Sequence, residues 1–147
     1  MNNEFIPREQ AMEMKALGFD EPCLTSYGID YELMSIWKVE DEFTPSIKLK
    51  DEPIGSYVQN SVHFHLSNWC AAPLWQQAFR WFGDKHDMLS KVLFRRIPNT
   101  IYVYIISCEK NQNIGLYAHT EVYQTYEEAQ LACLKELIQT LKEKQNN

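Results

Sequence analysis

The sequence predicts an α+β fold: a single domain over residues 1–147, with about three helices packed mainly on one face of an antiparallel sheet of three to five strands. Two segments, Pro73–Lys85 and Thr125–Lys144, repeat their apolar residues at helical spacing. Other runs rich in β-branched and aromatic residues follow one another around short polar turns, as in hairpins. At 147 residues, 45% of them hydrophobic, the chain can bury a core of its own.

Pro7–Leu17 predicts the first helix, because Pro7 suits a helix start and Gly18 suits the left-handed residue that ends a helix. Its apolar stripe is thin, so we expect this helix on the surface of the fold. Residues 1–4, before it, and 145–147, at the other end of the chain, are expected to be loose.

The next segments are less regular. Leu33–Val39 is apolar and β-prone enough to predict a strand. Residues 40–55 are charged and broken by prolines and a glycine, which favours a loop. Tyr57–Leu66 alternates weakly and predicts a further strand.

Pro73–Lys85 predicts the central helix, with Pro73 at the first helical position. Its apolar residues fall in one arc of about 160° on a helical wheel. They are Leu74, Trp75, Ala78, Phe79, Trp81 and Phe82. Large aromatic side chains bury much area, so we expect this helix at the centre of the core.

Three strands should follow as an antiparallel meander. Lys91–Ile97 and Ile101–Ser107 flank a Pro-Asn turn, and Gly115–Tyr123 follows a polar turn. Thr125–Lys144 then predicts the last helix, opened by a capping box between Thr125 and Glu128.

The net charge of −6 argues against a general binder of nucleic-acid backbones. Residues 80–96 depart from this balance, with five basic and two acidic side chains. No run is long and apolar enough to predict a membrane span, and the N-terminal stretch has no apolar signal core. The four cysteines lie far apart without a CxxC pair, which favours reduced thiols in a cytoplasmic protein.

The most metal-like cluster is His63, His65 and Cys70, with His86 further along. In a strand, positions 63 and 65 point the same way, so two imidazoles can share a metal. The spacing matches no standard zinc motif. We therefore favour two edge-strand histidines and a buried thiol, and keep a metal site or an enzyme centred on this cluster as the alternative.

One face of the meander gathers aromatic side chains. They are Tyr102, Tyr104, Tyr117, His119 and Tyr123. If exposed, this face is a stacking platform for single-stranded nucleic acid, with Arg95 and Arg96 supplying charge. The acidic net charge disfavours that function, and we expect the face to pack under a helix instead.

Motifs for catalysis are absent from the sequence: it has no nucleophile elbow, no P-loop and no dinucleotide fingerprint. The paired carboxylates at residues 40–42 and 51–52 fall in the predicted loop, where we expect them to be solvated. A Cys–His pair, such as Cys70 or Cys108 with His119, is formally available. We predict no cofactor and lean against an enzyme.

Three stretches of the chain resemble a known family. FIPREQAMEMKALGFDEPC, PLWQQAFRWF and TYEEAQLACLKELI are similar, in order and rough spacing, to uncharacterised small proteins of phages, prophages and mobile elements of gut-type bacteria. The resemblance implies no fold, ligand or activity. It implies a cytoplasmic accessory protein of a mobile genome.

From the resemblance, the aromatic content and the missing catalytic motifs, we expect a protein that binds a macromolecular partner, most simply another protein. Trp and Arg are common anchors of such contacts. The predicted contact surface is Trp75, Phe79, Arg80, Arg95 and Arg96. A homodimer, in which a second copy covers leftover aromatic surface, is a further alternative.

Overall fold

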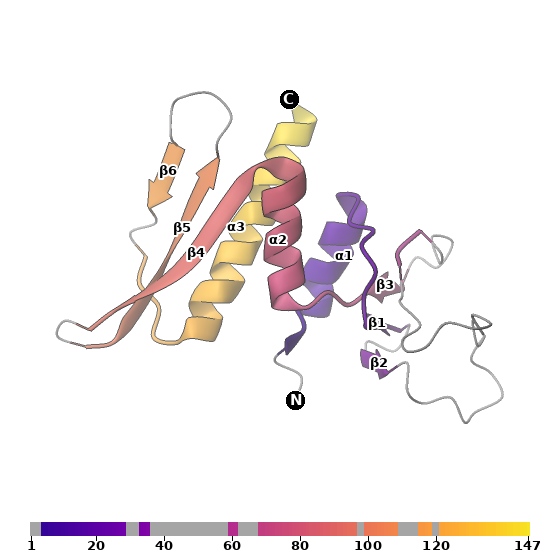
Figure 1. Ribbon diagram of the computed structural model, residues 1–147, viewed down its shortest axis with the longest axis horizontal. Helices are drawn as coiled ribbons and strands as arrows, with labels where there is room; N and C mark the ends of the chain where they lie inside the picture. The colour runs from indigo at the N-terminus through magenta and orange to yellow at the C-terminus, as the bar shows by residue number, and fades with distance from the viewer. Residues whose placement is uncertain are drawn as a thin grey trace. The chain divides into compact units, whose positions relative to one another are not determined.

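The computed structural model describes residues 4–28, 33–35, 59–61, 68–96, 99–108, 115–118 and 121–147. The chain divides into two compact units, Met1–Leu74 and Trp75–Asn147. Helices and antiparallel strands occur in both, which confirms the predicted α+β class (Figure 1). The sequence predicts one sheet, whereas the described strands form two, each of three strands. The single-domain organisation over residues 1–147 stays a prediction.

The first unit contains α1 (Arg8–Ala16), β1 (Thr25–Tyr27), β2 (Leu33–Ser35) and β3 (Cys70–Ala71). Its sheet has the order β2-β1-β3, and β1 runs antiparallel to both neighbours. α1 packs against β3.

The predicted first helix is confirmed. Gly18 has a φ of 95°, the left-handed conformation that glycine adopts without strain, and ends the helix. The N–H of Phe19 donates to the carbonyl of Met14 at 2.9 Å, which closes the last turn. Met14 and Phe19 are both buried, so the helix and its end are fixed to the core of this unit.

Two short strands of this unit escape a sequence-based prediction. β1 and β3 have three and two residues, too few to show a period. A buried side chain helps to hold β3: Asn60 donates to the carbonyl of Phe19 at 2.6 Å and accepts from the N–H of Ala71 at 2.9 Å. Asn60 therefore connects segments far apart in the sequence.

The other predictions for this part of the chain are tested only in places. β2 confirms the beginning of the strand predicted at Leu33–Val39. Within Tyr57–Leu66 the structure places a turn at Asn60 and Ser61, so a strand through these two residues is wrong. The remainder of both segments, and the loop predicted at 40–55, lie outside the described residues.

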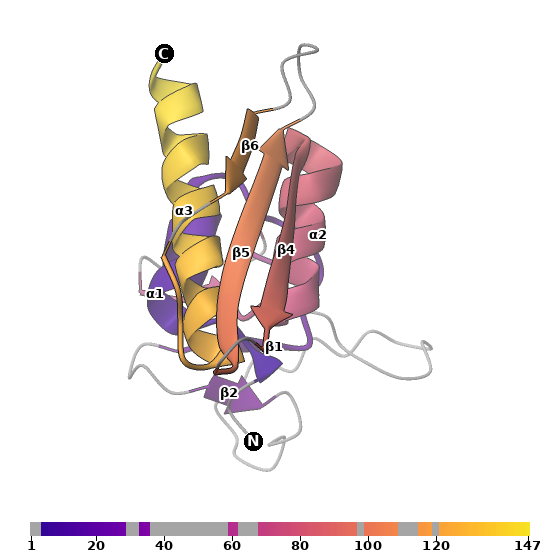
Figure 2. The same ribbon diagram turned by 90° about the vertical axis from the view of Figure 1, so that its left-hand side faces the viewer.

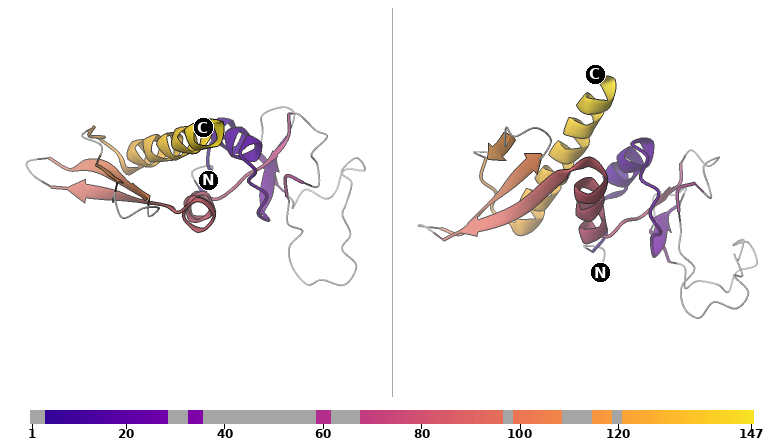
Figure 3. Two further views of the ribbon diagram at one scale, coloured as in Figure 1. Left: turned by 90° about the horizontal axis from the view of Figure 1, so that it is seen from above. Right: turned by 45° about the horizontal axis from the view of Figure 1, so that its top comes forward.

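The second unit contains α2 (Trp75–His86), β4 (Met88–Arg95), β5 (Ile101–Cys108), β6 (Gly115–Ala118) and α3 (Tyr126–Asn146). The strands form the predicted meander, with order β4-β5-β6 and antiparallel pairing throughout. Viewed as in Figure 2, the sheet lies in front and both helices lie behind it. The expectation of helices on one face is thus confirmed for this unit, and from above α3 forms its own layer beside the strands (Figure 3).

The beginning of α2 differs from the prediction. Pro73 precedes the helix, because its carbonyl accepts a backbone hydrogen bond from Ile6 at 3.0 Å and Leu74 forms a β-bridge with Phe5. Both contacts belong to the first unit, so the extended backbone continues to Leu74. Of the six residues in the predicted apolar arc, Ala78, Trp81 and Phe82 are buried. The other three, Leu74, Trp75 and Phe79, are half-buried.

β4 begins earlier than predicted. Asp87, with a φ of 53°, turns the chain directly after α2, and Met88 is already fully buried in the first strand position. The strand predicted at Lys91–Ile97 therefore runs from Met88 to Arg95. A single residue, Asp87, thus connects α2 to β4.

The last part of the chain follows the prediction closely. β6 is shorter than the predicted strand, but Tyr123 pairs with Tyr102 through two backbone hydrogen bonds of 2.9 Å. The capping box is confirmed, since Thr125 accepts from the N–H of Glu128 and Glu128 accepts from the N–H of Thr125. α3 extends past Lys144 to Asn146.

The core of this unit lies between the sheet and the two helices. Met88, Tyr104 and Ile106 come from the sheet and are at most 3% exposed. α3 contributes most of the remaining apolar surface. Its buried residues are Ala129, Cys133, Leu134, Leu137, Ile138 and Leu141. Among the described helices, none is both long and apolar enough to cross a membrane.

Candidate functional site

The two faces of the β4-β5-β6 sheet differ in what covers them. Residues opposite each other in an antiparallel ladder point to the same face. The face toward the helices contains Met88, Ser90, Val92, Phe94, Tyr102, Tyr104 and Ile106. We call the opposite side of β4 and β5 the outer face. It contains Leu89, Lys91, Leu93, Arg95, Ile101, Val103, Ile105 and Ser107.

The outer face exposes apolar side chains. Leu89 is 50% exposed and Leu93 is 41% exposed, and the isoleucines and valine of β5 on this face are half-buried. This face points toward the viewer in Figure 2, with neither α2 nor α3 in front of it, although at its beginning the Leu89 side chain lies against Gly83 of α2. A cluster of large apolar side chains left at a surface is typical of an interaction site.

Basic side chains interrupt this apolar surface. Lys91 and Arg95 alternate with Leu89 and Leu93 along the strand, and all four lie on the same face. At the end of β4, Phe94 is 62% exposed and the guanidinium of Arg96 lies 5.7 Å from its ring centroid. The strand therefore combines exposed apolar area with positive charge.

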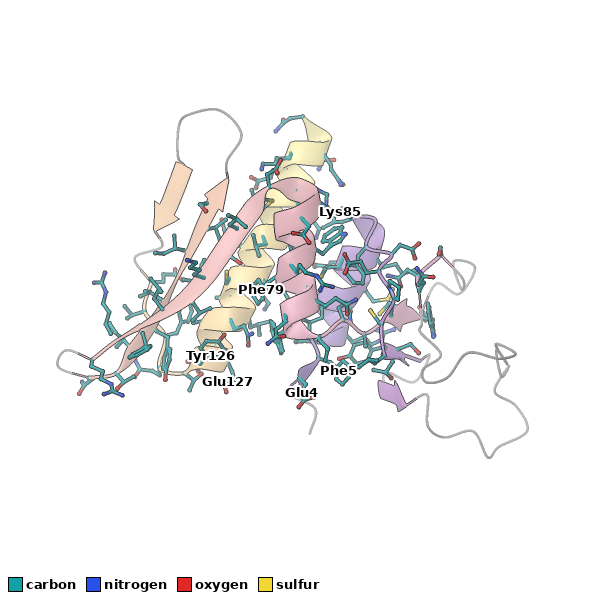
Figure 4. All side chains as sticks on the ribbon, in the orientation of Figure 1. Glu4, Phe5, Phe79, Lys85, Tyr126 and Glu127 are labelled. Atoms are coloured by element: carbon teal, nitrogen blue, oxygen red, sulfur yellow. The ribbon has the colours of Figure 1, made fainter. Side chains whose placement is uncertain are left out.

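A groove runs beside β4. It has a volume of about 370 Å³, and its residues come from α2, β4 and α3. They are Gln76, Phe79, Ser90, Lys91, Val92, Leu93, Tyr126 and Gln130. Because side chains alternate between the faces of a strand, four consecutive lining residues of β4 place the groove along the strand's edge. We call it the edge groove; Figure 4 labels Phe79 on α2 and Tyr126 at the start of α3.

Among the described strands, β4 lies at the edge of its sheet. In the order β4-β5-β6 it pairs with β5 alone, and we call its other side the open edge. Among the described residues, no backbone hydrogen bond connects Ser90–Arg95 to anything except β5. About half of the N–H and C=O groups of an edge strand point away from its neighbour and can accept a further strand.

The five residues of the predicted contact surface lie on two elements. Trp75 and Phe79 stack on α2, with ring centroids 6.1 Å apart, and both are half-buried. Arg80 is exposed on the same helix, and Arg95 and Arg96 are exposed at the end of β4. Of the five, Phe79 lines the edge groove.

Sequence reasoning missed Lys91, Leu93 and Tyr126 as members of a possible binding surface. The signal for the first two is the run KVLFRR, in which neither alternate position is consistently polar. A strand with one solvated face normally shows such a polar set. For Tyr126 the sequence gives no indication of exposure, because the residue falls within the apolar arc of its helix. In the structure its side chain is 46% exposed.

The expected packing of the tyrosine face is confirmed for Tyr104, while Tyr102 and Tyr123 are half-buried. Tyr104 is 3% exposed, and its ring stacks on Tyr123 with centroids 6.0 Å apart. Tyr102 meets the edge of the Tyr126 ring at 6.2 Å. These three sheet tyrosines therefore form no open stacking platform, while the side chains of Tyr117 and His119 lie outside the described residues.

Hydrogen bonds order this cluster. Tyr104 and Tyr123 are hydrogen-bonded through their side chains, and the Tyr123 hydroxyl donates to Glu121 at 2.9 Å. Burial, followed by the nearby Tyr123 and Glu136, raises the pKa of Tyr104 well above its usual value. The pKa of Tyr123 is also raised, mainly by burial. Both phenols thus stay protonated at neutral pH.

Of the candidate metal cluster, the structure describes Cys70 and His86. Cys70 is buried and free, and burial raises its pKa to about 11 although Arg8 and Lys15 act in the opposite direction. A protonated thiol is a poor metal ligand and nucleophile. His86 packs against the Trp81 ring with centroids 4.5 Å apart.

His63 and His65 lie outside the described residues, as do the carboxylates at 40–42 and 51–52. In the part of the chain that the structure describes, no three His, Cys, Asp or Glu side chains are grouped to hold a metal ion. The metal alternative therefore has no support from Cys70 itself.

We compared the chain with known protein families, curated proteins and solved structures. No family model, no curated protein and no solved structure matches the chain.

Proposed function

We propose that this protein binds another protein through its second unit and catalyses no reaction. The observation that carries the proposal is the alternation of exposed leucines with basic side chains on β4, at Leu89, Lys91, Leu93 and Arg95. Burying a half-exposed leucine gains about 1 kcal/mol on association, and several such residues are needed for a specific contact. The basic residues add steering toward an acidic partner.

The predicted contact residues extend this surface. Phe79 contributes through the edge groove, and Arg95 and Arg96 contribute at the end of β4. Trp75, which is half-buried, and Arg80, which is exposed, lie on α2, and aromatic and arginine side chains are enriched in contacts between proteins. The overall charge of −6 favours a protein over a nucleic acid as the partner.

We further propose that the protein works in the cytoplasm as an accessory protein of a phage or other mobile element. The resemblance of its three stretches to such proteins supports this origin. The thiols of Cys23, Cys70 and Cys133 are buried and form no disulfide, which is consistent with a reducing compartment.

Site-specific photo-crosslinking tests the proposed function. A photoreactive phenylalanine analogue is placed at Leu93 in one variant and at Lys135, exposed on α3, in the control. We expect a covalent adduct with one defined host protein from position 93 and none from position 135. Equal adducts at both positions, or none at position 93, would contradict the proposal.

Charge reversal adds a second measurement. We expect Arg80→Glu and Arg95→Glu together to weaken capture of the cross-linked partner while the circular dichroism spectrum stays unchanged. If capture survives both changes, the arginines are not part of the contact.

A further inference from the structure

We propose that the partner docks as an extended segment that adds a fourth strand to the sheet along the open edge of β4, and that this segment alternates acidic with apolar residues. The inference rests on the proposed function and specifies the chemistry of its partner. Three features of the second unit carry it: an open strand edge, a groove alongside that edge, and positive charge on one side of it.

The open edge supplies main-chain hydrogen bonds. β4 is eight residues long, and its outer N–H and C=O groups meet no other described backbone. A segment of about eight residues, about 26 Å long, can pair along the whole strand. Addition of a strand to a sheet edge gains affinity from these hydrogen bonds and specificity from the side chains that alternate along it.

The edge groove accounts for the apolar half of the alternation. Its aromatic residues, Phe79 and Tyr126, lie on the helix side of the sheet edge, and Tyr126 is 46% exposed. Side chains of an added strand that point toward the helices would enter the groove beside these rings. A volume of about 370 Å³ is at the low end of the range for ligand pockets, about 300–1,000 Å³, and accommodates a few aliphatic side chains.

The basic side chains of β4 account for the acidic half of the alternation expected in the docked segment. The side chains that point the opposite way would lie beside Lys91, Leu93 and Arg95 on the outer face. Opposite charges on neighbouring strands attract and like charges repel, so acidic residues are favoured beside Lys91 and Arg95. The expected segment therefore has a period of two, with apolar residues toward the groove and Asp or Glu toward the outer face.

The same charges argue against a second copy of this chain at the edge. Two β4 strands paired with each other would bring together two sets of Lys91, Arg95 and Arg96. Lysine on an edge strand is a common protection against such self-pairing. An acidic segment at the edge would attract these basic side chains, whereas a second copy of the chain would repel them.

A selection from random peptides tests the inference without a known partner. Peptides about twelve residues long, enough to span β4, are displayed on phage and selected on the full-length protein. We expect enriched sequences in which Asp or Glu alternates with apolar residues. Enrichment of basic or non-alternating sequences, or no enrichment at all, would overturn the proposal.

Matched variants then locate the charge effect. For an enriched peptide we expect Lys91→Glu to weaken binding about tenfold, because attraction across the strands becomes repulsion. Lys135→Glu makes the same charge change on exposed α3 and should alter affinity by less than about twofold. Equal losses in both variants would show a general charge effect and contradict the inference.

Hydrogen exchange measured by NMR decides whether a strand is added. In the complex we expect slower exchange for the alternate amides of Ser90–Arg95 that do not bond to β5. If amides outside β4 are protected and those of β4 exchange as before, strand addition is overturned. The proposed function is not tested by that outcome, because the cross-linking experiment tests it separately. A dimer whose protected amides are those of β4 would instead identify a second copy at this edge and also overturn the inference.

Discussion

Tyr104 stacks on Tyr123 beneath α3, with ring centroids 6.0 Å apart, and the two side chains are hydrogen-bonded. This pair fixes which face of the β4-β5-β6 sheet belongs to the core. Because Tyr104 points toward the helices, its neighbours Val103 and Ile105 point to the outer face. The outer face of β4 and β5 is therefore aliphatic and basic. On the other face Tyr104 is covered, whereas Phe94 at the end of β4 stays 62% exposed.

Loss of the Tyr104 hydroxyl should weaken the fold. We expect Tyr104→Phe to lower the free energy of unfolding by about 1 kcal/mol, because a buried hydrogen bond with Tyr123 is lost. Tyr126→Phe is the matched control, since its ring is 46% exposed, and should change stability by less than about 0.5 kcal/mol. Urea denaturation measures both; equal effects would show that the hydrogen bond is not formed.

The outer face and the core should respond differently to the same change. Leu134→Ala empties fully buried volume in α3 and should cost about 2–5 kcal/mol. Leu93→Ala, at a side chain 41% exposed, should cost less than about 1 kcal/mol. Should the two substitutions cost the same in urea denaturation, Leu93 would be a core residue and not a surface one.

The capping box should stabilise α3 measurably. Thr125→Ala removes the acceptor for the Glu128 N–H at 3.2 Å and should cost about 1 kcal/mol. Gln124→Ala, one residue earlier, keeps the backbone hydrogen bond that residue 124 donates to Glu128 and should be nearly neutral. A thermal melt that cannot separate the two variants would contradict the role of the cap.

Buried thiols should make the protein less stable at high pH. Burial raises the pKa of Cys133 from an ordinary value of 9.0 to about 12, while a hydrogen bond with Ser90 acts in the opposite direction. The folded state therefore favours the protonated thiol. Its contribution is complete below pH 9.0 and is lost as the pH rises toward about 12. We expect the stability of Cys133→Ala to fall less steeply over this range.

Thiol alkylation at pH 8, followed by peptide mass spectrometry, checks whether the thiols are buried and protonated in the folded protein. Cys70 and Cys133 should react with iodoacetamide far more slowly in the native protein than in urea, because both are buried and protonated. Rapid modification of either thiol in the native state would contradict its burial.

The sequence predicts the regular parts of this fold because their signals are local. The wheel of α2, the capping box of α3 and the alternation of β5 each need only neighbouring residues. β1 and β3 could not be predicted, since strands of three and two residues are too short to show a period. They depend on distant partners: β3 pairs with β1, and Ala71 of β3 donates to Asn60. The sequence predicts the start of α2 too early for a similar reason. The carbonyl of Pro73 accepts a hydrogen bond from the N–H of Ile6, a residue far away in the sequence.

The candidate site was predicted only in part. Aromatic and arginine composition identified Phe79, Arg95 and Arg96, but not the edge groove that places Phe79 beside β4. Which strand lies at the edge of a sheet depends on strand order, and the sequence does not specify strand order locally. The choice between the tyrosine face and the outer face likewise depended on where α3 packs.

Backbone hydrogen exchange of the free, full-length protein tests the central claim most directly, namely that β4 is a strand with an open edge. We predict that the amides of Ser90–Arg95 alternate, with those bonded to β5 exchanging slowly and those on the outer edge exchanging at least about tenfold faster. Uniform protection of these amides would mean that another segment already covers the edge. Uniformly fast exchange would mean that β4 is not a stable strand, and either result would contradict the account.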